Sequence, residues 1–354
     1  MVTQLEEYIL ANWDKMFYDR PRPDRLSFFI NNNKWIRSLI WVFDGKKPCA
    51  FAKWSQDAGQ TRILEQEFCN IKYVREIITT EHLKNCIPLP LGCIKIDINT
   101  VLILRFVSGR KMSVEINKTN IFGRNELKKD IDRCVEWLCR FQQETKLDEV
   151  ELTKEYIQKE YFFIIEQYSK KVVVTPWLEH FLLNVRENLL GLVNEKIPIC
   201  CSHGDFFSEN IHVYSDGSIS VLDWADMQKN DLAFWDLFMF FCSFRLANDN
   251  QTTEDNILKS FDFIFFKENW VSKLVNGFFD KYARIMRIEP KMLKAFLPLF
   301  LIKNAAQQVD EEILGIRKKH YWNKLLNYYV EKGDTPFCEK RTKILSEGSD
   351  EKNN

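Results

Sequence analysis

The chain of 354 residues lacks any long hydrophobic run. A membrane-spanning helix needs roughly 18 or more apolar residues in succession. The nearest candidate, residues 232–244, is short, rich in aromatic residues and interrupted by Asp236. Residues 1–7 contain neither a basic nor an apolar segment, so they do not resemble a secretory signal. We therefore expect a cytoplasmic protein with no membrane partner.

The chain also lacks net charge, because 50 Lys and Arg residues balance 50 Asp and Glu residues. This balance argues against bulk electrostatic attraction to nucleic acid or to an anionic surface, so we expect no nucleic-acid partner. A chain of this length can bury a large hydrophobic core and is expected to form two lobes.

Metal-binding and disulfide patterns are missing as well. The sequence has ten cysteines, but no Cys-x-x-Cys pair occurs and the five histidines are scattered. Cysteines in this arrangement are typical of reduced, buried thiols. We expect no zinc site.

The polar residues that are present point to phosphoryl transfer. Asp205 is followed five residues later by Asn210, and Asp223 comes after a predicted hairpin. Residues 211–214 and 218–222 alternate in polarity around an Asp-Gly dipeptide, which is a strong hairpin signal. If that dipeptide forms the turn, Asn210 and Asp223 face each other with Cβ atoms roughly 5 Å apart. An amide oxygen and a carboxylate so placed can share Mg²⁺, while Asp205 accepts a proton from an attacking hydroxyl.

This segment resembles the aminoglycoside phosphotransferase and choline kinase superfamily of small-molecule kinases. The resemblance rests first on the His-Gly-Asp of residues 203–205, which is followed by four further residues and Asn210. It continues in the hydrophobic-Asp-Trp of residues 222–224. Residues 230–237 match a third family element, with Asn where Gly is usual.

The resemblance implies a role for each polar residue. Asp205 would be the catalytic base, Asn210 and Asp223 would bind the metal, and Asp236 would brace the catalytic loop. His203 would be structural and would tie the loop to the metal-binding segment. The alternative is that the three catalytic candidates only cap a turn, start a strand and end one.

The amino-terminal part has the pattern of a nucleotide-binding lobe. Three strands and a helix are predicted, at residues 25–30, 37–43 and 49–54 and at about 61–79. Glu67 falls inside the apolar stripe of this helix, so it needs a cationic partner. Lys53, pointing inward from the third strand, is the expected partner, and such a pair positions nucleotide phosphates in kinases. The alternative is that Lys53 extends to solvent and Glu67 lies at the edge of the stripe.

Two further nucleotide contacts are less well defined. The loop of residues 31–35, where kinases have a Gly-rich loop, contains no glycine. Because Asn tolerates left-handed backbone better than most residues, the loop either cradles phosphate with Lys34 or is a plain polar hairpin. Residues 101–109 form an apolar strand that resembles the family hinge. The resemblance implies that the Arg105 carbonyl and the Val107 amide contact the adenine.

The sequence therefore predicts an α+β, two-lobe, protein-kinase-like fold. A small antiparallel β lobe would span residues 1–107, and a larger, mainly helical lobe would span residues 108–330 and carry the hairpin. Residues 331–354 are expected to form a flexible tail. Within the larger lobe, helices are predicted at residues 125–147, 153–170 and 175–196, and at least three more between residues 253 and 330.

The expected activity is transfer of the γ-phosphoryl group of ATP, with GTP possible, to a hydroxyl of a small metabolite or antibiotic, with Mg²⁺ as cofactor. A protein acceptor is disfavoured because no Ala-Pro-Glu segment occurs. The alternative is a catalytically silent, kinase-like binding or scaffold protein, which the glycine-free loop suggests.

Overall fold

The computed structural model describes residues 2–32, 37–55, 57–112, 121–244, 253–313 and 321–333. The chain divides into two compact units. The first contains Met1–Met112, His203–Asp205 and Glu209–Met227, and the second contains Ser113–Ser202, Phe206–Ser208 and Gln228–Asn354. The hairpin that follows Asp205 thus groups by its contacts with the amino-terminal unit.

The first unit is built on a five-stranded antiparallel sheet with the order β1-β2-β3-β5-β4. Its strands are β1 (Ser27–Asn32), β2 (Arg37–Asp44), β3 (Lys47–Ser55), β4 (Pro90–Ile96) and β5 (Asn99–Arg105). The three strands predicted before the helix are confirmed as β1 to β3, with ends that differ by one or two residues. Two further helices precede this sheet, α1 (Val2–Ala11) and α2 (Trp13–Met16), which the sequence did not predict.

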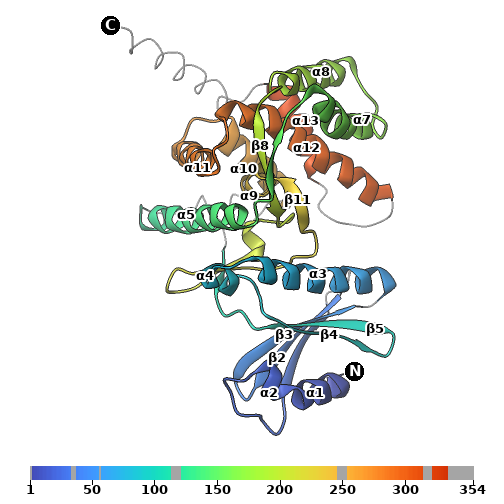
Figure 1. The fold of residues 1–354 in the computed structure, drawn as a ribbon, viewed down its shortest axis with the longest axis vertical. Helices are drawn as coiled ribbons and strands as arrows, with labels where there is room; N and C mark the ends of the chain where they lie inside the picture. Colours follow the sequence, from blue (N-terminus) through green and yellow to red (C-terminus); the bar gives the residue numbers. More distant parts are fainter. Residues whose placement is uncertain are drawn as a thin grey trace. The chain divides into compact units, whose positions relative to one another are not determined.

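Helices cover both faces of the sheet (Figure 1). α1 and α2 lie on one face, where Leu5, Ile9 and Trp13 join a buried cluster with apolar residues of β2, β3 and β5. α3 (Ala58–Ile77) lies on the other face, and α4 (Glu81–Asn85) follows it. Since side chains alternate along a strand, β3 presents small apolar residues to one layer and Lys53 to α3.

The predicted helix after β3 is confirmed, but it begins earlier than expected. The Asp57 carboxylate accepts a hydrogen bond from the Gln60 backbone N–H at 2.9 Å and a second one from the Gln60 side chain at 2.9 Å. Such an N-cap satisfies a backbone donor that the first helical turn leaves without a partner. The helix therefore starts at Ala58 rather than near residue 61.

The hairpin of the first unit is present in a register that differs from the prediction. β9 (Ile211–Val213) pairs with β10 (Ile219–Val221), and β6 (Arg110–Lys111) pairs with the other edge of β9. Tyr214 and Ser218 close a loop of three residues, in which Gly217 has a φ of 86°. A two-residue Asp-Gly turn was expected. The extra residue shifts the pairing by one, so Asn210 bonds to Leu222 and does not face Asp223 across the ladder.

The second unit is mainly helical around a three-stranded antiparallel sheet, β11-β8-β7. These strands are β7 (Asp148–Glu151), β8 (Lys196–Ser202) and β11 (Gln228–Leu232). Its longer helices are α5 (Ile121–Glu144), α7 (Phe163–Ser169), α8 (Pro176–Leu190), α9 (Phe234–Cys242), α10 (Thr253–Phe265), α11 (Trp270–Met286), α12 (Pro290–Ile313) and α13 (Trp322–Lys332). Two short elements precede α7, α6 (Lys154–Tyr156) and a π-helical segment, Ile157–Phe162.

The helices predicted in this part of the chain are confirmed, with corrected bounds. The helix expected over residues 125–147 spans Ile121–Glu144, and the one expected over residues 153–170 includes the π-helical segment. The helix expected over residues 175–196 ends at Leu190 with Gly191 as its C-cap, and β8 begins at Lys196. Aromatic residues of α9, α11 and α12 pack together, including Phe238, Phe279 and Phe300. The aromatic residues of these helices therefore build a core.

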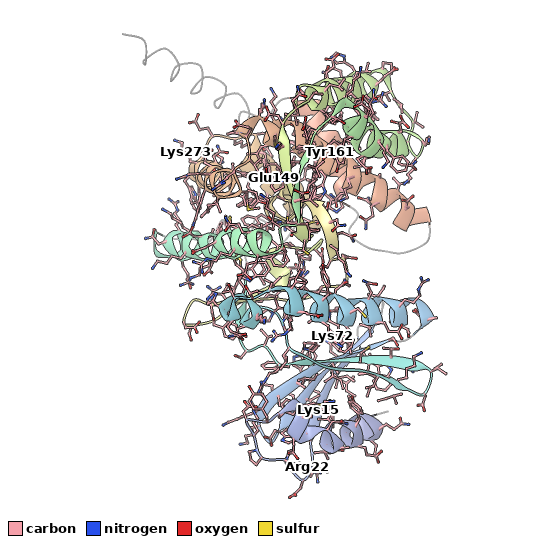
Figure 2. All side chains as sticks on the ribbon, viewed as in Figure 1. Lys15, Arg22, Lys72, Glu149, Tyr161 and Lys273 are labelled. Atoms are coloured by element: carbon pink, nitrogen blue, oxygen red, sulfur yellow. The ribbon has the colours of Figure 1, made fainter. Side chains whose placement is uncertain are left out.

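Charged side chains lie mostly at the surface of each unit (Figure 2). Lys15, Arg22, Lys72 and Glu149 are exposed, whereas Tyr161 of the π-helical segment is buried. In the described ranges, no helix combines the length and low polarity that a membrane span requires.

Candidate active site

A buried ion pair joins the sheet of the first unit to α3. Lys53 Nζ lies 2.7 Å and 2.8 Å from the two carboxylate oxygens of Glu67. The Glu67 side chain is 0% exposed and the Lys53 side chain 9% exposed, so each charge depends on the other. The contact predicted from the helical stripe is confirmed, and the alternative of a solvent-directed Lys53 is wrong.

Lys53 also contacts the segment that follows the hairpin. Its ammonium group lies 3.0 Å from Asp223 Oδ1. Asp223 comes just after β10 and has a φ of 65°, in the left-handed region that few non-glycine residues adopt. Its side chain is 34% exposed, so part of the carboxylate remains open to solvent. Lys53, Glu67 and Asp223 therefore meet in one group.

Asp205 and Asn210 form a second group within the same unit. Asn210 Nδ2 donates to Asp205 Oδ2 at 3.0 Å and to the Asp205 backbone oxygen at 3.0 Å. Asn210 ends a short 3₁₀ turn, Ser208–Asn210, directly before β9. The two side chains thus hold each other across the tight turn that the five-residue spacing allows.

His203 connects the two groups. Its Nε2–H donates to the Leu222 carbonyl at 3.0 Å, and its Nδ1 accepts from the Asp205 N–H at 3.3 Å. The ring is completely buried, and burial lowers the pKa of His203 to about 4. A neutral imidazole with its proton on Nε2 satisfies both bonds. The predicted contact of His203 with the segment before Asp223 is confirmed.

Gly204 allows this loop to pass close to the chain that follows Asp223. Its φ is 80°, and a Cβ atom at this position would lie 2.1 Å from the Asp226 carbonyl oxygen. No side chain fits there without movement of the backbone. Glycine is therefore required between His203 and Asp205.

Asn70 is a site residue that the sequence reasoning missed. This buried side chain of α3 donates to the Trp224 carbonyl at 2.8 Å and to the Ala225 carbonyl at 3.3 Å. It lies one helical turn after Glu67, so α3 holds both Lys53 and the segment behind Asp223. A polar residue inside the apolar stripe was the signal that could have identified it.

The hinge candidates lie at the end of β5. Ala50 pairs with Arg105 and Lys53 with Leu102, so Arg105 is about 10 Å along the sheet from Lys53. The Arg105 side chain donates to Asp19 and lowers the pKa of that exposed carboxyl. Val107 follows the strand, and no described residue accepts a hydrogen bond from its amide. Lys34 lies outside the described residues.

The donor set of the two groups fits a magnesium ion better than a transition metal. No described group of three or more His, Cys, Asp and Glu side chains is arranged to hold a metal. Mg²⁺ usually takes only one or two protein ligands, and its other partners are water and phosphate oxygens. An amide oxygen of Asn210 and the half-exposed carboxylate of Asp223 are ligands of this kind. Asp236 is fully buried at the start of α9. That it braces the catalytic loop stays a prediction.

Comparisons with known proteins reveal similarity in structure but not in sequence. No family model and no curated protein matches the chain. Aminoglycoside phosphotransferase APH(4)-Ia superimposes with a TM-score of 0.53 at 11% identity, over 94% of this chain and 99% of that one. A GDP complex of aminoglycoside 2'-phosphotransferase-IIIa gives 0.51 at 13% identity, over 92% and 97%. Choline kinase LicA from Streptococcus pneumoniae gives 0.51 at 13% identity, over 92% and 98%.

These similarities cover nearly the whole of each chain, so they apply to the complete architecture and not to one motif. The antiparallel sheet with α3 and the larger helical unit are parts of the predicted arrangement, whereas the hairpin after Asp205, expected in the larger lobe, groups with the first unit. The chain therefore has the α+β, two-lobe, protein-kinase-like fold that is also found in these aminoglycoside phosphotransferases and this choline kinase.

Proposed function

We propose that the protein is a Mg²⁺-dependent small-molecule kinase. It would transfer the γ-phosphoryl group of ATP or GTP to a hydroxyl of a small metabolite or antibiotic. One observation carries the proposal: Lys53 is held between Glu67 and Asp223 while Asn210 holds Asp205, and His203 bonds to both segments. The similar structures include complexes with GDP and with ADP, which also supports a nucleotide site.

Lys53 is the proposed phosphate-binding cation. Its ammonium group is nearly buried and fixed by two carboxylates, so little reorganisation is needed when nucleotide phosphates arrive. The Asp223 carboxylate is the more exposed of its two partners. We therefore propose that Glu67 keeps Lys53 in place. The adenine would contact the Arg105 carbonyl and the Val107 amide, within a nucleotide-binding lobe of residues 1–107.

Asn210 and Asp223 are the proposed magnesium ligands. Bound Mg²⁺ would neutralise charge on the nucleotide phosphates. Because Asn210 Nδ2 bonds to Asp205, its amide oxygen is directed away from that carboxylate and is available as a ligand.

Asp205 is the proposed base. The acceptor oxygen forms a bond to the γ-phosphorus, and the bond from that phosphorus to the β–γ bridging oxygen breaks. The acceptor proton passes to the Asp205 carboxylate, and the products are a phosphomonoester and the nucleoside diphosphate. The hydrogen bond from Asn210 fixes the orientation of the carboxylate before the acceptor binds. Catalysis would depend on positioning and on charge rather than on a covalent intermediate.

The first test is thermal stabilisation by ATP and by GTP, each with and without Mg²⁺. A ligand at 100 times its Kd should add about 2.7 kcal/mol to the free energy of unfolding. We expect a Mg²⁺-dependent stabilisation that Asp223→Ala removes and that Asp24→Ala, a change at an exposed carboxylate of the same unit, preserves. Absence of stabilisation by either nucleotide in the wild type would contradict the proposal and favour the silent binding protein.

A further inference from the structure

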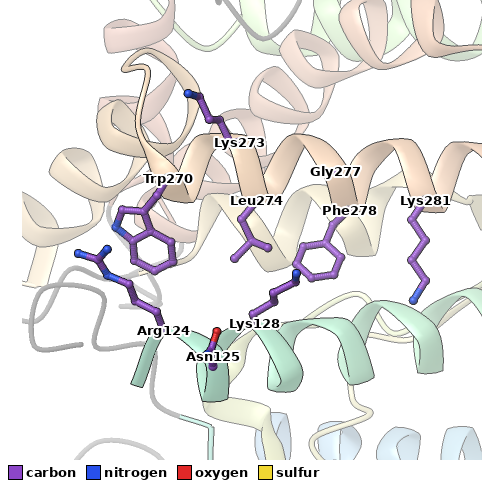
Figure 3. Close-up of a pocket in the computed structure, with 9 residues that line it drawn as sticks. All are labelled: Arg124, Asn125, Lys128, Trp270, Lys273, Leu274, Gly277, Phe278 and Lys281. Carbon is purple, nitrogen blue, oxygen red and sulfur yellow. The ribbon is translucent and has the colours of Figure 1, made fainter. Parts of the chain in front are cut away.

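A hollow in the second unit lies between α5 and α11, with a volume of about 520 Å³ (Figure 3). Volumes of this size are typical of small-molecule sites. Trp270, Leu274 and Phe278 point from α11 toward α5 and form an apolar wall. Phe278 is only 5% exposed, so this wall is continuous with the core.

Gly277 keeps the floor of the hollow open. It lies in the interior of α11, where glycine is a poorer helix former than alanine. A Cβ atom added there would meet nothing within 4 Å, so no neighbouring atom requires glycine at this position. Its backbone lines the hollow, so the absence of a side chain there leaves this space open.

Four cationic side chains surround the apolar wall. Lys281 is neutralised by Asp132 at 2.6 Å, and Lys273 lies 3.7 Å from Glu268. Arg124 stacks over the Trp270 ring with 4.9 Å to its centroid.

Two of these charges have no ion-pair partner among the described residues. In the described part of the chain, neither Arg124 nor Lys128 has a carboxylate within ion-pairing distance. Both extend from the first turns of α5, and Lys128 reaches toward Phe278 (Figure 3). An apolar wall beside two unpaired cations is complementary to a ligand with an apolar body and a negative head.

We propose that this hollow, the α5–α11 site, binds a small amphipathic organic anion. The apolar body lies against Leu274 and Phe278 over Gly277, and the carboxylate, sulfonate or phosphate head pairs with Lys128 and Arg124. The site uses none of the residues assigned to phosphoryl transfer, so it does not rest on the proposed kinase activity.

The test measures binding of anilinonaphthalene sulfonate by its fluorescence, with saturating ATP and Mg²⁺ to occupy the proposed nucleotide site. Octanoate should displace the probe, whereas octylammonium, with the same tail and opposite charge, should not. Lys128→Gln should weaken binding of the probe by about fivefold, and added salt should reduce this difference in affinity between the wild type and the variant. Lys129→Gln, a neighbouring exposed lysine outside the hollow, should leave the affinity unchanged.

The floor of the site gives an independent test. Gly277→Leu should weaken binding of the probe by about tenfold or more. Gly277→Ala should reduce the affinity for the probe less than Gly277→Leu does, and it should raise the melting temperature of the protein. Equal affinity in wild type and Gly277→Leu would overturn the proposal, provided that the variant melts cooperatively. Equal displacement by octanoate and octylammonium would also overturn it. So would equal effects of Lys128→Gln and Lys129→Gln.

Discussion

In the candidate site, the shape of the catalytic loop depends on individual buried side chains that each make two hydrogen bonds. His203 is the clearest example, because one nitrogen donates to Leu222 and the other accepts from Asp205. Protonation of Nδ1 would remove that acceptor and place a charge in a fully buried position. The imidazole must therefore stay neutral for the loop to keep its shape.

This requirement predicts a loss of stability in acid. The pKa of His203 is about 4 when folded and near 6.5 when unfolded, so the unfolded chain binds more protons between those values. The free energy of unfolding is unaffected by His203 above pH 6.5 and falls as the pH drops toward 4. We expect a loss of about 2 kcal/mol by pH 5 from this residue.

Urea unfolding at pH 7 and pH 5 measures the total loss, and ¹⁵N histidine spectra identify the contribution of His203. Its ring should remain neutral and protonated on Nε2 at pH 5. In His203→Gln, the free energy of unfolding should fall less between pH 7 and pH 5, by the amount attributed to His203. A His203 ring that titrates near pH 6.5 in the folded protein would contradict the prediction.

Lys53 and Glu67 make a second prediction at this scale. Lys53→Met leaves the Glu67 carboxylate buried without its cation and should destabilise the protein by about 3 kcal/mol. Lys53→Met combined with Glu67→Leu removes both charges and should recover most of that loss. Chemical denaturation of the single and double variants gives the coupling energy. Additive losses would mean that the two side chains do not depend on each other.

The sequence indicated this pair because a carboxylate inside an apolar helical stripe requires a partner. It did not indicate Asn70, whose partners are the backbone carbonyls of Trp224 and Ala225. A hydrogen bond to a backbone carbonyl can be made to any residue type, so no particular residue in the sequence identifies the partner. A side chain paired with another side chain is therefore easier to predict than one paired with a distant peptide group.

At the scale of elements, the position of the hairpin was predicted correctly, but its register was not. An Asp-Gly dipeptide fits a two-residue turn, and it equally fits a three-residue loop that ends with a left-handed glycine. Gly217, with a φ of 86°, adopts the second arrangement, and the Asp216 carboxylate accepts a hydrogen bond from the Ser218 N–H at 2.8 Å. The two turns differ in which side chains face each other. In the observed register Ile211 and Val213 face Val221 and Ile219, whereas a two-residue turn would place Val213 opposite Ser220, so the alternation of apolar side chains favours the three-residue loop.

The loop between β8 and the hairpin carries its own prediction. Gly204→Ala should destabilise the first unit by more than about 2 kcal/mol, because its Cβ would overlap the Asp226 carbonyl and its φ is positive. Gly45→Ala is the matched control, since Gly45 has a φ of 59° and no atom within 4 Å of a Cβ. It should cost only about 1 kcal/mol. Thermal denaturation measures both, and equal costs would show that backbone strain alone explains the effect.

At the scale of the whole molecule, the fold was predictable although only 11–13% of residues match the similar structures. The motif of residues 203–210 and 222–224 indicated the kinase-like fold through its family resemblance, and the alternating strands and the helix with a buried carboxylate agreed with its amino-terminal lobe. α1 and α2 were not predicted, because their apolar residues become informative only when a sheet face is available to cover. Tertiary contacts, rather than the local sequence pattern, therefore determine where α1 and α2 form.

Whether the whole molecule is an enzyme or a silent binding protein can be tested by changing the proposed base. A protein of this fold can bind nucleotide without turnover, so binding alone does not establish catalysis. Asp205→Asn keeps an oxygen that can accept the hydrogen bond from Asn210 but removes the proposed base. We expect turnover of an acceptor to fall by about 10²-fold or more, while stabilisation by ATP and Mg²⁺ remains.

Release of nucleoside diphosphate across a panel of small-molecule hydroxyl compounds measures this turnover. The wild type and Asp205→Asn are compared with Asp223→Ala, which should lose both turnover and stabilisation. Full turnover in Asp205→Asn would show that another group accepts the proton. Stabilisation by nucleotide without turnover on any acceptor in the wild type would instead favour the silent binding protein with nucleotide as its ligand, because the proposed phosphate and metal contacts of Lys53 and Asp223 do not require Asp205.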